Sequence, residues 1–129
     1  MSQENVEAVR KAYEALSTKG IEAFSEHWAD QIEWRTMRDH WQGKEAGRAY
    51  LHELLDLFDD LTTETVDLTD AGDEHVVAYL RYGGRSKRSG MAVPPEYFAI
   101  LMEVRDGKIT HALEYATRNE ALEAVGLRE

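Results

Sequence analysis

Apolar residues recur along the chain with two different spacings, which separate the expected helices from the expected strands. Spacings of three and four residues, as in Val6, Val9, Tyr13 and Leu16, are typical of amphipathic helices. Strict alternation of apolar and polar residues is typical of strands. Helices are predicted over residues 2–19, 21–29 and 44–60. Strands are predicted over residues 31–36, 62–71, 75–83, 91–105 and 109–116, with loops at 38–43 and 83–90.

Two local motifs predict the structure of the last part of the sequence. Asp106-Gly107 lies between two predicted strands, and this dipeptide favours the positive φ angles of a tight hairpin turn. Thr117 and Glu120 have the spacing of a helix capping box, which predicts a short terminal helix that ends at Gly126.

The order of elements predicts one α+β domain over residues 1–129. Helices with one short strand among them are followed by a curved antiparallel sheet and a final helix. A chain of 129 residues is long enough to bury a core without disulfides or a structural metal. No repeat, linker or low-complexity segment divides it.

Composition and charge exclude several classes of function. The formal net charge is -10, which disfavours nucleic acid and anionic membrane surfaces as partners, because both require clustered cations. The absence of cysteine excludes thiol chemistry and Cys-based zinc sites. No apolar run approaches the length of a membrane span and no signal peptide is recognisable, so a cytoplasmic protein is expected. The five histidines lack the spacing of metal ligands, so no metal is expected.

The last predicted strand carries the most informative candidate. Strand alternation puts Glu114 on one face with Thr110, Ala112 and Ala116, so a carboxyl group lies on a face of small residues. Such a carboxyl is either an acid–base group in a cavity or a structural residue that is exposed or paired with a cation. Arg81, within an apolar strand, is the expected partner, because an unpaired buried charge is costly.

Three segments together resemble a known family. They are the run from Asp106 to Tyr115, the following Arg118–Leu127, and the opening helix Val6–Leu16. Ala29–Trp34 fits the same pattern. These segments resemble the SnoaL-like, ketosteroid-isomerase-like branch of the nuclear-transport-factor-two-like superfamily, across nearly the whole chain. The family includes isomerases, polyketide cyclases, dehydratases, epoxide hydrolases and binding domains, so the resemblance is more specific for fold than for function.

The resemblance implies a cone-shaped curved sheet wrapped around the N-terminal helices, an apolar pocket in its open end, and a homodimer through the outer face of the sheet. Glu114 matches the position of the catalytic aspartate of SnoaL-like cyclases and of the limonene-epoxide-hydrolase relatives. Arg81 matches the arginine that bridges two acids in those hydrolases, and Tyr13 lies near the hydrogen-bonding tyrosine of the isomerases. Gly83 and Ile100 stand where further acidic or histidine residues occur in relatives, so the complete isomerase and hydrolase sites are absent.

The pocket wall is expected to be aromatic and apolar, like most small-molecule sites. The ligand-binding candidates are Trp34, Tyr50, Tyr79, Phe98, Ile100 and Met102. Glu96 is a possible second acid. The basic cluster Arg85, Lys87 and Arg88 is either a solvated hairpin loop or an anion-attracting pocket rim.

We therefore expect a small-molecule enzyme that needs no cofactor and uses general acid–base chemistry, of isomerase, cyclase, dehydratase or hydrolase type, on an apolar substrate. Glu114 would move the proton, Arg81 would set its ionisation, and Tyr13 would donate a hydrogen bond to a developing oxyanion. The alternatives are a non-catalytic binding module for an apolar metabolite and a dimeric interaction domain with a filled core.

Overall fold

Four helices follow from the apolar spacing and the capping signals. They are α1 (Ser2–Lys19), α2 (Ile21–Ser25), α3 (Lys44–Asp56) and α4 (Arg118–Ala124). The computed structural model describes residues 2–126, except for the side chains of residues 2 and 93–95. In α1, Val6, Val9, Ala12 and Tyr13 are buried, as the predicted amphipathic pattern requires. The capping box of α4 is formed by Thr117 and Glu120, which confirms that prediction.

A single sheet contains all six strands of the described chain. They are β1 (Trp28–Arg35), β2 (His40–Gln42), β3 (Phe58–Gly72), β4 (His75–Ser86), β5 (Ala92–Arg105) and β6 (Lys108–Tyr115). Their order across the sheet is β2-β1-β6-β5-β4-β3. β1 pairs with β6 in parallel, and the other neighbouring strands are antiparallel.

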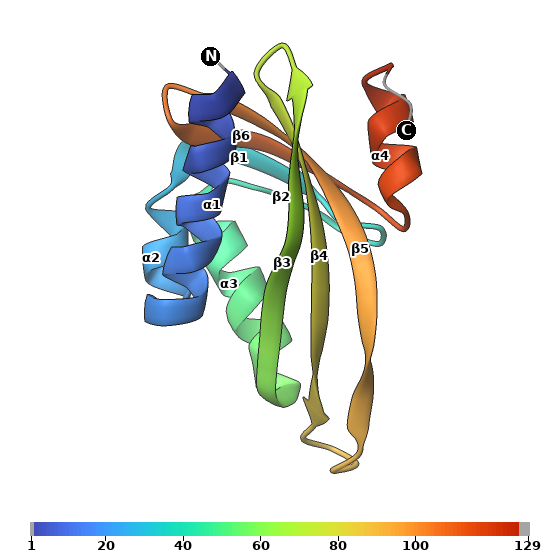
Figure 1. Ribbon diagram of the computed structural model, residues 1–129. Helices are drawn as coiled ribbons and strands as arrows, with labels where there is room; N and C mark the ends of the chain where they lie inside the picture. The colour runs from blue at the N-terminus through green and yellow to red at the C-terminus, as the bar shows by residue number, and fades with distance from the viewer. Residues whose placement is uncertain (1, 127–129) are drawn as a thin grey trace.

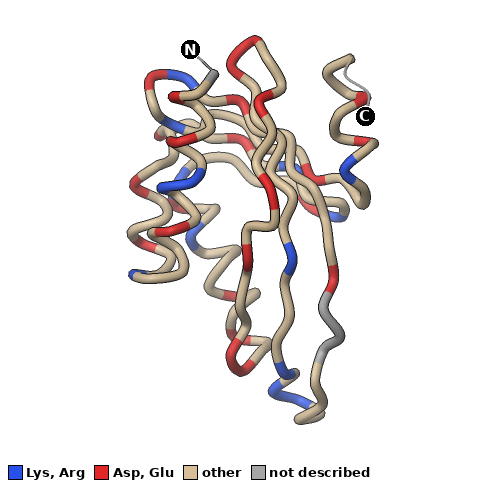
Figure 2. Tube along the Cα trace, in the orientation of Figure 1, with Lys and Arg blue, Asp and Glu red and all other residues tan. Residues whose placement is uncertain are grey.

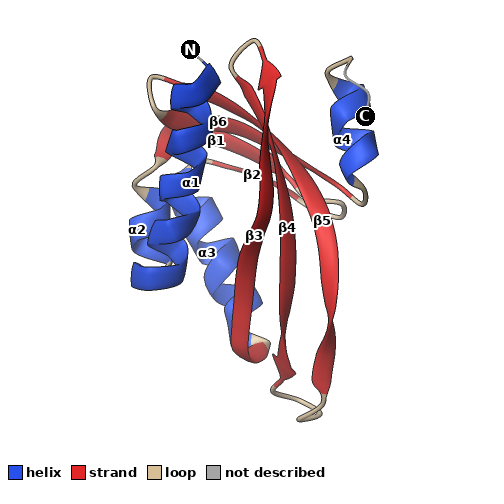
Figure 3. Cartoon of the chain, in the orientation of Figure 1, coloured by secondary structure: helices blue, strands red, loops and turns tan. Residues whose placement is uncertain are grey.

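The sheet curves around the N-terminal helices, and this curvature creates the interior of the fold. Helices α1, α2 and α3 lie on its concave side, while α4 lies on its convex side (Figure 1, Figure 3). Register shifts interrupt four of the five strand pairings, and such bulges bend a sheet. At Gly84 a Cβ atom would lie 3.0 Å from the Leu61 Cα, so glycine permits β3 and β4 to approach closely at one bend. The expected α+β fold, with a cone-shaped sheet around the N-terminal helices, is confirmed.

Two separate groups of buried side chains lie on the two faces of the sheet. The concave group joins α1 and α2 to the sheet, and its largest fully buried residue is Trp28. The convex group is smaller and packs α4, through Ala121 and Leu122, onto Val77 and Leu101. Each face therefore has its own hydrophobic core.

Two segments differ from the sequence-based prediction. Trp28 begins β1 instead of ending the second helix, because the backbone N–H of Ile109 donates to the His27 carbonyl and β1 aligns with β6 there. Residues 38–43 form part of a hairpin instead of a loop. The Thr36 hydroxyl accepts hydrogen bonds from the backbone N–H groups of Arg38 and Asp39, which turns the chain so that β2 pairs with β1.

Strand boundaries account for the other differences. β3 begins at Phe58 and β4 extends to Ser86, so the helix before β3 and the loop after β4 are shorter than predicted. The hairpin at Asp106-Gly107 has φ angles of 50° and 76°, which confirms the predicted turn with two positive φ values.

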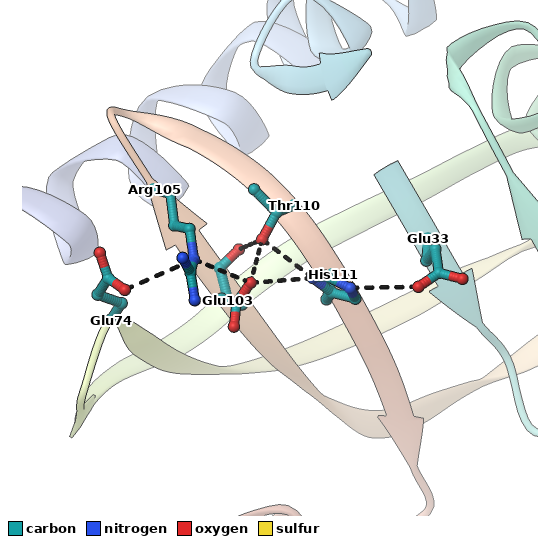
Figure 4. A network of polar contacts seen from close by, with 6 residues as sticks. All are labelled: Glu33, Glu74, Glu103, Arg105, Thr110 and His111. Carbon is teal, nitrogen blue, oxygen red and sulfur yellow. Dashed lines mark hydrogen bonds and ion pairs between the residues drawn. The ribbon is translucent and has the colours of Figure 1, made fainter. Parts of the chain in front are cut away.

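A polar network lies on the convex face, between β1, β5 and β6 (Figure 4). Glu103 Oε1 accepts a hydrogen bond of 2.7 Å from the Thr110 hydroxyl and lies 3.3 Å from Arg105 Nε. His111 is 3.0 Å from the same Glu103 oxygen and 3.2 Å from Glu33 Oε2. The hydrogen bond from Thr110, aided by Arg105 and His111, lowers the pKa of Glu103.

The distribution of charge along the trace is uneven (Figure 2). Basic residues gather at the tip of the β4–β5 hairpin, and acidic residues are spread over the helices and over β3. No helix in the described part of the chain is long and apolar enough to cross a membrane. The cytoplasmic location and the homodimer through the convex face stay predictions.

Candidate functional site

An apolar cavity of about 260 Å³ lies inside the cone, between the concave face of the sheet and helices α1 and α3. Aromatic side chains dominate its wall: eight of the chain's twelve aromatic residues line it. These eight are Tyr13, Phe24, Trp34, Trp41, Tyr50, Phe58, Tyr82 and Phe98. The rest of the lining is aliphatic apart from Thr63 and Glu114. The cavity therefore has the composition of a binding site for a ligand that packs against apolar and aromatic side chains.

Glu114 reaches this cavity because of its register on β6. It pairs with Ile100 of β5, which in turn pairs with Ala78 of β4, so these residues share the concave face. The neighbouring Ala112 is fully buried on the same face. Glu114 is accordingly on the inward face predicted from the alternation along the strand. The prediction that Thr110 shares this face is wrong, because a register shift between β5 and β6 puts the Thr110 hydroxyl beside Glu103 on the convex face.

One hydrogen bond orients the Glu114 carboxyl group. The indole Nε1 of Trp34 donates to Glu114 Oε2 at 2.9 Å, from β1 to β6. Among the described residues no other group donates to this carboxyl, so Oε1 is available to a ligand. By contrast, the buried indole nitrogens of Trp28 and Trp41 make no hydrogen bond with the described residues. The Trp34–Glu114 pair is therefore the polar contact that positions the acid.

Burial raises the pKa of Glu114, and the hydrogen bond from Trp34 opposes this only in part. No Lys, Arg or His of the described chain lines the cavity, and no salt bridge reaches Glu114. A carboxylate without a cationic partner is costly to bury, because the charged form loses its hydration without compensation. Glu114 thus combines the environment of an acid–base group with a fixed orientation.

The aromatic wall beside Glu114 is held by close ring packing. Trp34 and Trp41 stack with ring centroids 5.3 Å apart and an interplanar angle of 17°, and Tyr50 adjoins Trp41 at 6.2 Å. Gly47 of α3 makes this arrangement possible. A Cβ atom at that position would lie 2.4 Å from the Trp41 ring and 2.7 Å from the Trp28 ring.

Tyr13 and Tyr50 bring two hydroxyl groups to the same cavity from α1 and α3. Burial raises the pKa of Tyr13 well above its usual value, and the negative charge of Glu114 adds to that effect. Burial and Glu114 also raise the pKa of Tyr50. Both phenols therefore keep their protons at neutral pH and can serve as hydrogen-bond donors.

The cavity opens into a wider basin of about 810 Å³, and the two share Met37, Tyr50, Leu54, Tyr82 and Glu114. Four further carboxylates line the basin against a single basic residue, Arg38. The four are Asp39, Glu53, Asp56 and Glu96. The mouth of the site is therefore acidic.

Glu96 belongs to this mouth and not to the inner cavity. It is exposed and accepts a hydrogen bond of 2.9 Å from the Tyr82 hydroxyl. Burial and this hydrogen bond raise the pKa of Tyr82. Tyr82 also packs edge-on against Phe98, at a centroid distance of 5.5 Å. Glu96 and Tyr82 thus form one wall of the entrance.

The prediction that Arg81 contacts Glu114 is wrong. Arg81 lies on the opposite face of β4 from Leu80 and Tyr82, which line the cavity, and it pairs with Glu64 of β3 at 3.7 Å. Tyr79 shares the outward face and stacks on Tyr97, with centroids 5.6 Å apart, so it does not line the cavity either. The alternation along β4 was correct, but the wrong face was assigned to the pocket.

The other predicted site residues fall into two groups, those that line the cavity and those that do not. Tyr13, Trp34, Tyr50, Phe98 and Ile100 line the cavity together with Glu114. Met102 is fully buried in the concave core and does not reach the cavity. The basic cluster of Arg85, Lys87 and Arg88 lines neither the cavity nor the basin, so it forms a hairpin loop and not a pocket rim. Arg85 donates to the Gly90 carbonyl within that hairpin.

The sequence interpretation missed eleven of the seventeen described residues that line the cavity, and four of these eleven are aromatic: Phe24, Trp41, Phe58 and Tyr82. Tyr82 follows from the same alternation as Leu80, once the inward face of β4 is known. Trp41 could not be assigned because β2 is only three residues long. Phe24 lies in the predicted second helix, and it lines the cavity beside Tyr13, with the two ring centroids 5.0 Å apart.

Nothing in the described part of the chain forms a group of three or more His, Asp or Glu side chains that could hold a metal ion. The chemistry that these side chains offer is proton transfer by Glu114, hydrogen-bond donation by phenols, and contact with aromatic rings.

Comparison with known proteins identifies the class. The family model of the SnoaL-like domain matches residues 9–112, and the chain therefore belongs to the SnoaL-like domain family. No match to curated protein sequences was found.

Three of the solved structures with the same fold come from different organisms. A hypothetical protein with a ketosteroid isomerase-like fold from Catenulispora acidiphila, in complex with trimethylamine, shares 18% identity over 94% of this chain and 93% of its own, with a TM-score of 0.75. A putative SnoaL-like polyketide cyclase from Jannaschia shares 17% identity over 98% and 94%, with a TM-score of 0.76. An NTF2-like protein from Burkholderia thailandensis shares 26% identity over 86% and 88%, with a TM-score of 0.77. These likenesses establish the fold.

Proposed function

We propose that this protein is an enzyme that works without a cofactor, by general acid–base chemistry, on a small substrate with an apolar body. The observation that carries the proposal is Glu114, a carboxyl group without a cationic partner, fixed by Trp34 inside an aromatic cavity. A structural carboxylate is normally paired or solvated, whereas Glu114 is held where a substrate would lie.

The residues around the cavity have separate roles in this proposal. Glu114 accepts a proton from the substrate and returns it at another atom, and Trp34 keeps the carboxyl group aimed into the cavity. Tyr13 donates a hydrogen bond to the oxygen on which negative charge develops. The aromatic wall excludes water, which strengthens both interactions. Arg81 has no role, because it lies on the other face of the sheet.

A neutral probe substrate tests Glu114 without knowledge of the natural one. In 5-nitrobenzisoxazole a base removes the proton from the ring carbon, the N–O bond breaks, and a coloured cyanophenolate forms. Glu114→Gln keeps the size of the side chain but removes the base, so the rate should fall about 10²-fold or more. The rate of the wild-type protein should rise with pH through the pKa of Glu114, because only the ionised form accepts a proton.

Glu103→Gln is the matched control, since it removes the same charge from the convex face, outside the cavity. Its rate should equal that of the wild type. Equal rates for the wild type and Glu114→Gln would contradict the proposal. They would favour a binding module without turnover, which is consistent with Glu114 being the one charged residue among those that line the cavity.

A further inference from the structure

The balance of charge around the cavity points to the class of ligand, on the assumption of the proposed function that this cavity is the substrate site. Glu114 is the charged group of the inner wall, and the described residues supply it with a hydrogen bond but with no cation. A ligand with a positive charge would provide the missing counter-ion. A neutral ligand would remove water from the carboxyl group without supplying a counter-ion, which favours its protonated form.

The wall beside Glu114 suits a cation for a second, independent reason. The faces of aromatic rings carry partial negative charge, and Trp is the best of them at attracting ammonium groups. The stacked pair Trp34–Trp41, with Tyr50 next to it, adjoins the carboxyl group to which Trp34 donates. Rings on several sides and one carboxylate are the features with which proteins bind alkylated ammonium groups.

The entrance adds a third feature. Besides Glu114, the basin presents four carboxylates and one guanidinium group, and the whole chain carries a charge of -10. An acidic entrance attracts cations and repels anions before any contact forms. The volume of about 260 Å³ is below the range of about 300–1,000 Å³ that drug-sized ligands occupy, so the cavity holds a small group.

We propose that the cavity binds a small organic ammonium ion, with the charged nitrogen against Glu114 and its alkyl groups against Trp34, Trp41 and Tyr50. The remaining, apolar or polar, part of such a ligand would extend past Tyr82 into the basin.

Choline and 3,3-dimethylbutan-1-ol form the decisive pair of probes, because they have nearly the same shape and differ by a positive charge at one atom. Titration calorimetry at low salt should show that choline binds the wild-type protein at least about tenfold more tightly than the neutral alcohol. Glu114→Gln should lose most of this preference. Glu103→Gln, which changes the net charge of the chain equally, should keep it.

The pH dependence gives a second readout on the wild-type protein, so the test does not depend on any variant folding. Choline affinity should increase with pH as Glu114 ionises, and binding should release protons, while the affinity of the alcohol stays nearly constant. The other groups that face Glu114 or the basin are Tyr13, Tyr50, Tyr82, Arg38, Asp39, Glu53, Asp56 and Glu96. The profile of Glu114→Gln isolates their contribution.

Three results would overturn the proposal: no binding of choline, equal or weaker binding than that of the alcohol, or an unchanged preference in Glu114→Gln. If the ring opening of 5-nitrobenzisoxazole still depends on Glu114, such a result rejects the cationic ligand alone and leaves the acid–base function intact. Conversely, Glu114-dependent choline binding without ring opening would support the ligand class and reject the catalysis.

Discussion

The two faces of the sheet each carry a glutamate, and the surroundings of these two residues shift their pKa values in opposite directions. On the convex face, Glu103 accepts a hydrogen bond from Thr110 and lies beside Arg105 and His111, and its pKa is lowered (Figure 4). On the concave face, Glu114 has one indole donor and no cation among the described residues, and its pKa is raised. The two residues are on neighbouring strands, three residues apart in register, and their side chains lie on opposite faces of the sheet.

This contrast separates a structural carboxylate from a candidate functional one. The Glu103 side chain is 20% exposed, yet it is surrounded by groups that favour its charged form. Glu114 is surrounded by rings that do not. A protein gains nothing in stability from such an unpaired carboxyl, which is why the concave face is the better candidate for chemistry.

The largest expected difference between the two faces concerns packing. Trp28→Ala removes a fully buried ring of the concave core and should reduce the free energy of unfolding by about 3–5 kcal/mol. Tyr97→Ala removes a half-exposed ring of the convex face that stacks on Tyr79, and should cost only about 1 kcal/mol. Urea unfolding of both variants measures these values.

The same pair of variants tests the homodimer that we expect. If Tyr97→Ala costs as much as Trp28→Ala, and if its loss grows with protein concentration, the convex face is buried between two copies in solution. A small, concentration-independent loss would show that Tyr97 lies outside any stable interface.

Replacing each of the two glutamates by glutamine should have a smaller effect on stability, and only the change on the convex face should be destabilising. At neutral pH, Glu103→Gln should lower stability by about 1 kcal/mol because it weakens hydrogen bonds to a charged group. Glu114→Gln should leave stability unchanged or increase it, because it removes the cost of an uncompensated charge. Urea unfolding at a series of pH values measures the free energy of unfolding of both variants and of the wild-type protein.

The pH dependence follows from the directions of the two pKa shifts. The stability that Glu103 contributes is present above the ordinary pKa of glutamate and is lost as the pH falls through its lowered folded-state pKa. The penalty from Glu114 is present above its raised folded-state pKa and is relieved as the pH falls toward the ordinary value. If the free energy of unfolding changed with pH in the same way in Glu103→Gln and Glu114→Gln, the opposite pKa shifts of the two glutamates would be contradicted.

Much of this architecture could be predicted from the sequence, because it depends on local patterns. The period of α1, the turn at Asp106-Gly107 and the capping box at Thr117 each act over a few residues, and all three predictions are confirmed. The inward direction of Glu114 was predicted from small residues on its face, and Ala112 does lie there. Thr110 does not, because the register shift beside Glu103 places it on the convex face.

The predictions that were wrong concern features that depend on contacts between segments distant in the sequence. Trp28 has helical spacing with Phe24, but its pairing with Ile109 of β6 draws it into a strand. The alternation along β4 identified two faces but not which of them is concave, so Arg81 and Tyr79 were assigned to the cavity in place of Leu80 and Tyr82. Only the register between β4, β5 and β6 decides that question.

The most direct test of the account is a titration of Glu114 and Glu103 by NMR of their side-chain carboxyl carbons, in the wild-type protein and in Trp34→Phe. We predict that Glu114 titrates above the ordinary glutamate pKa and Glu103 below it. Loss of the indole donor should raise the pKa of Glu114 further and leave Glu103 unchanged. A Glu114 that titrates at or below Glu103 would mean that its charge is compensated, and would contradict its assignment as the acid–base residue of the cavity.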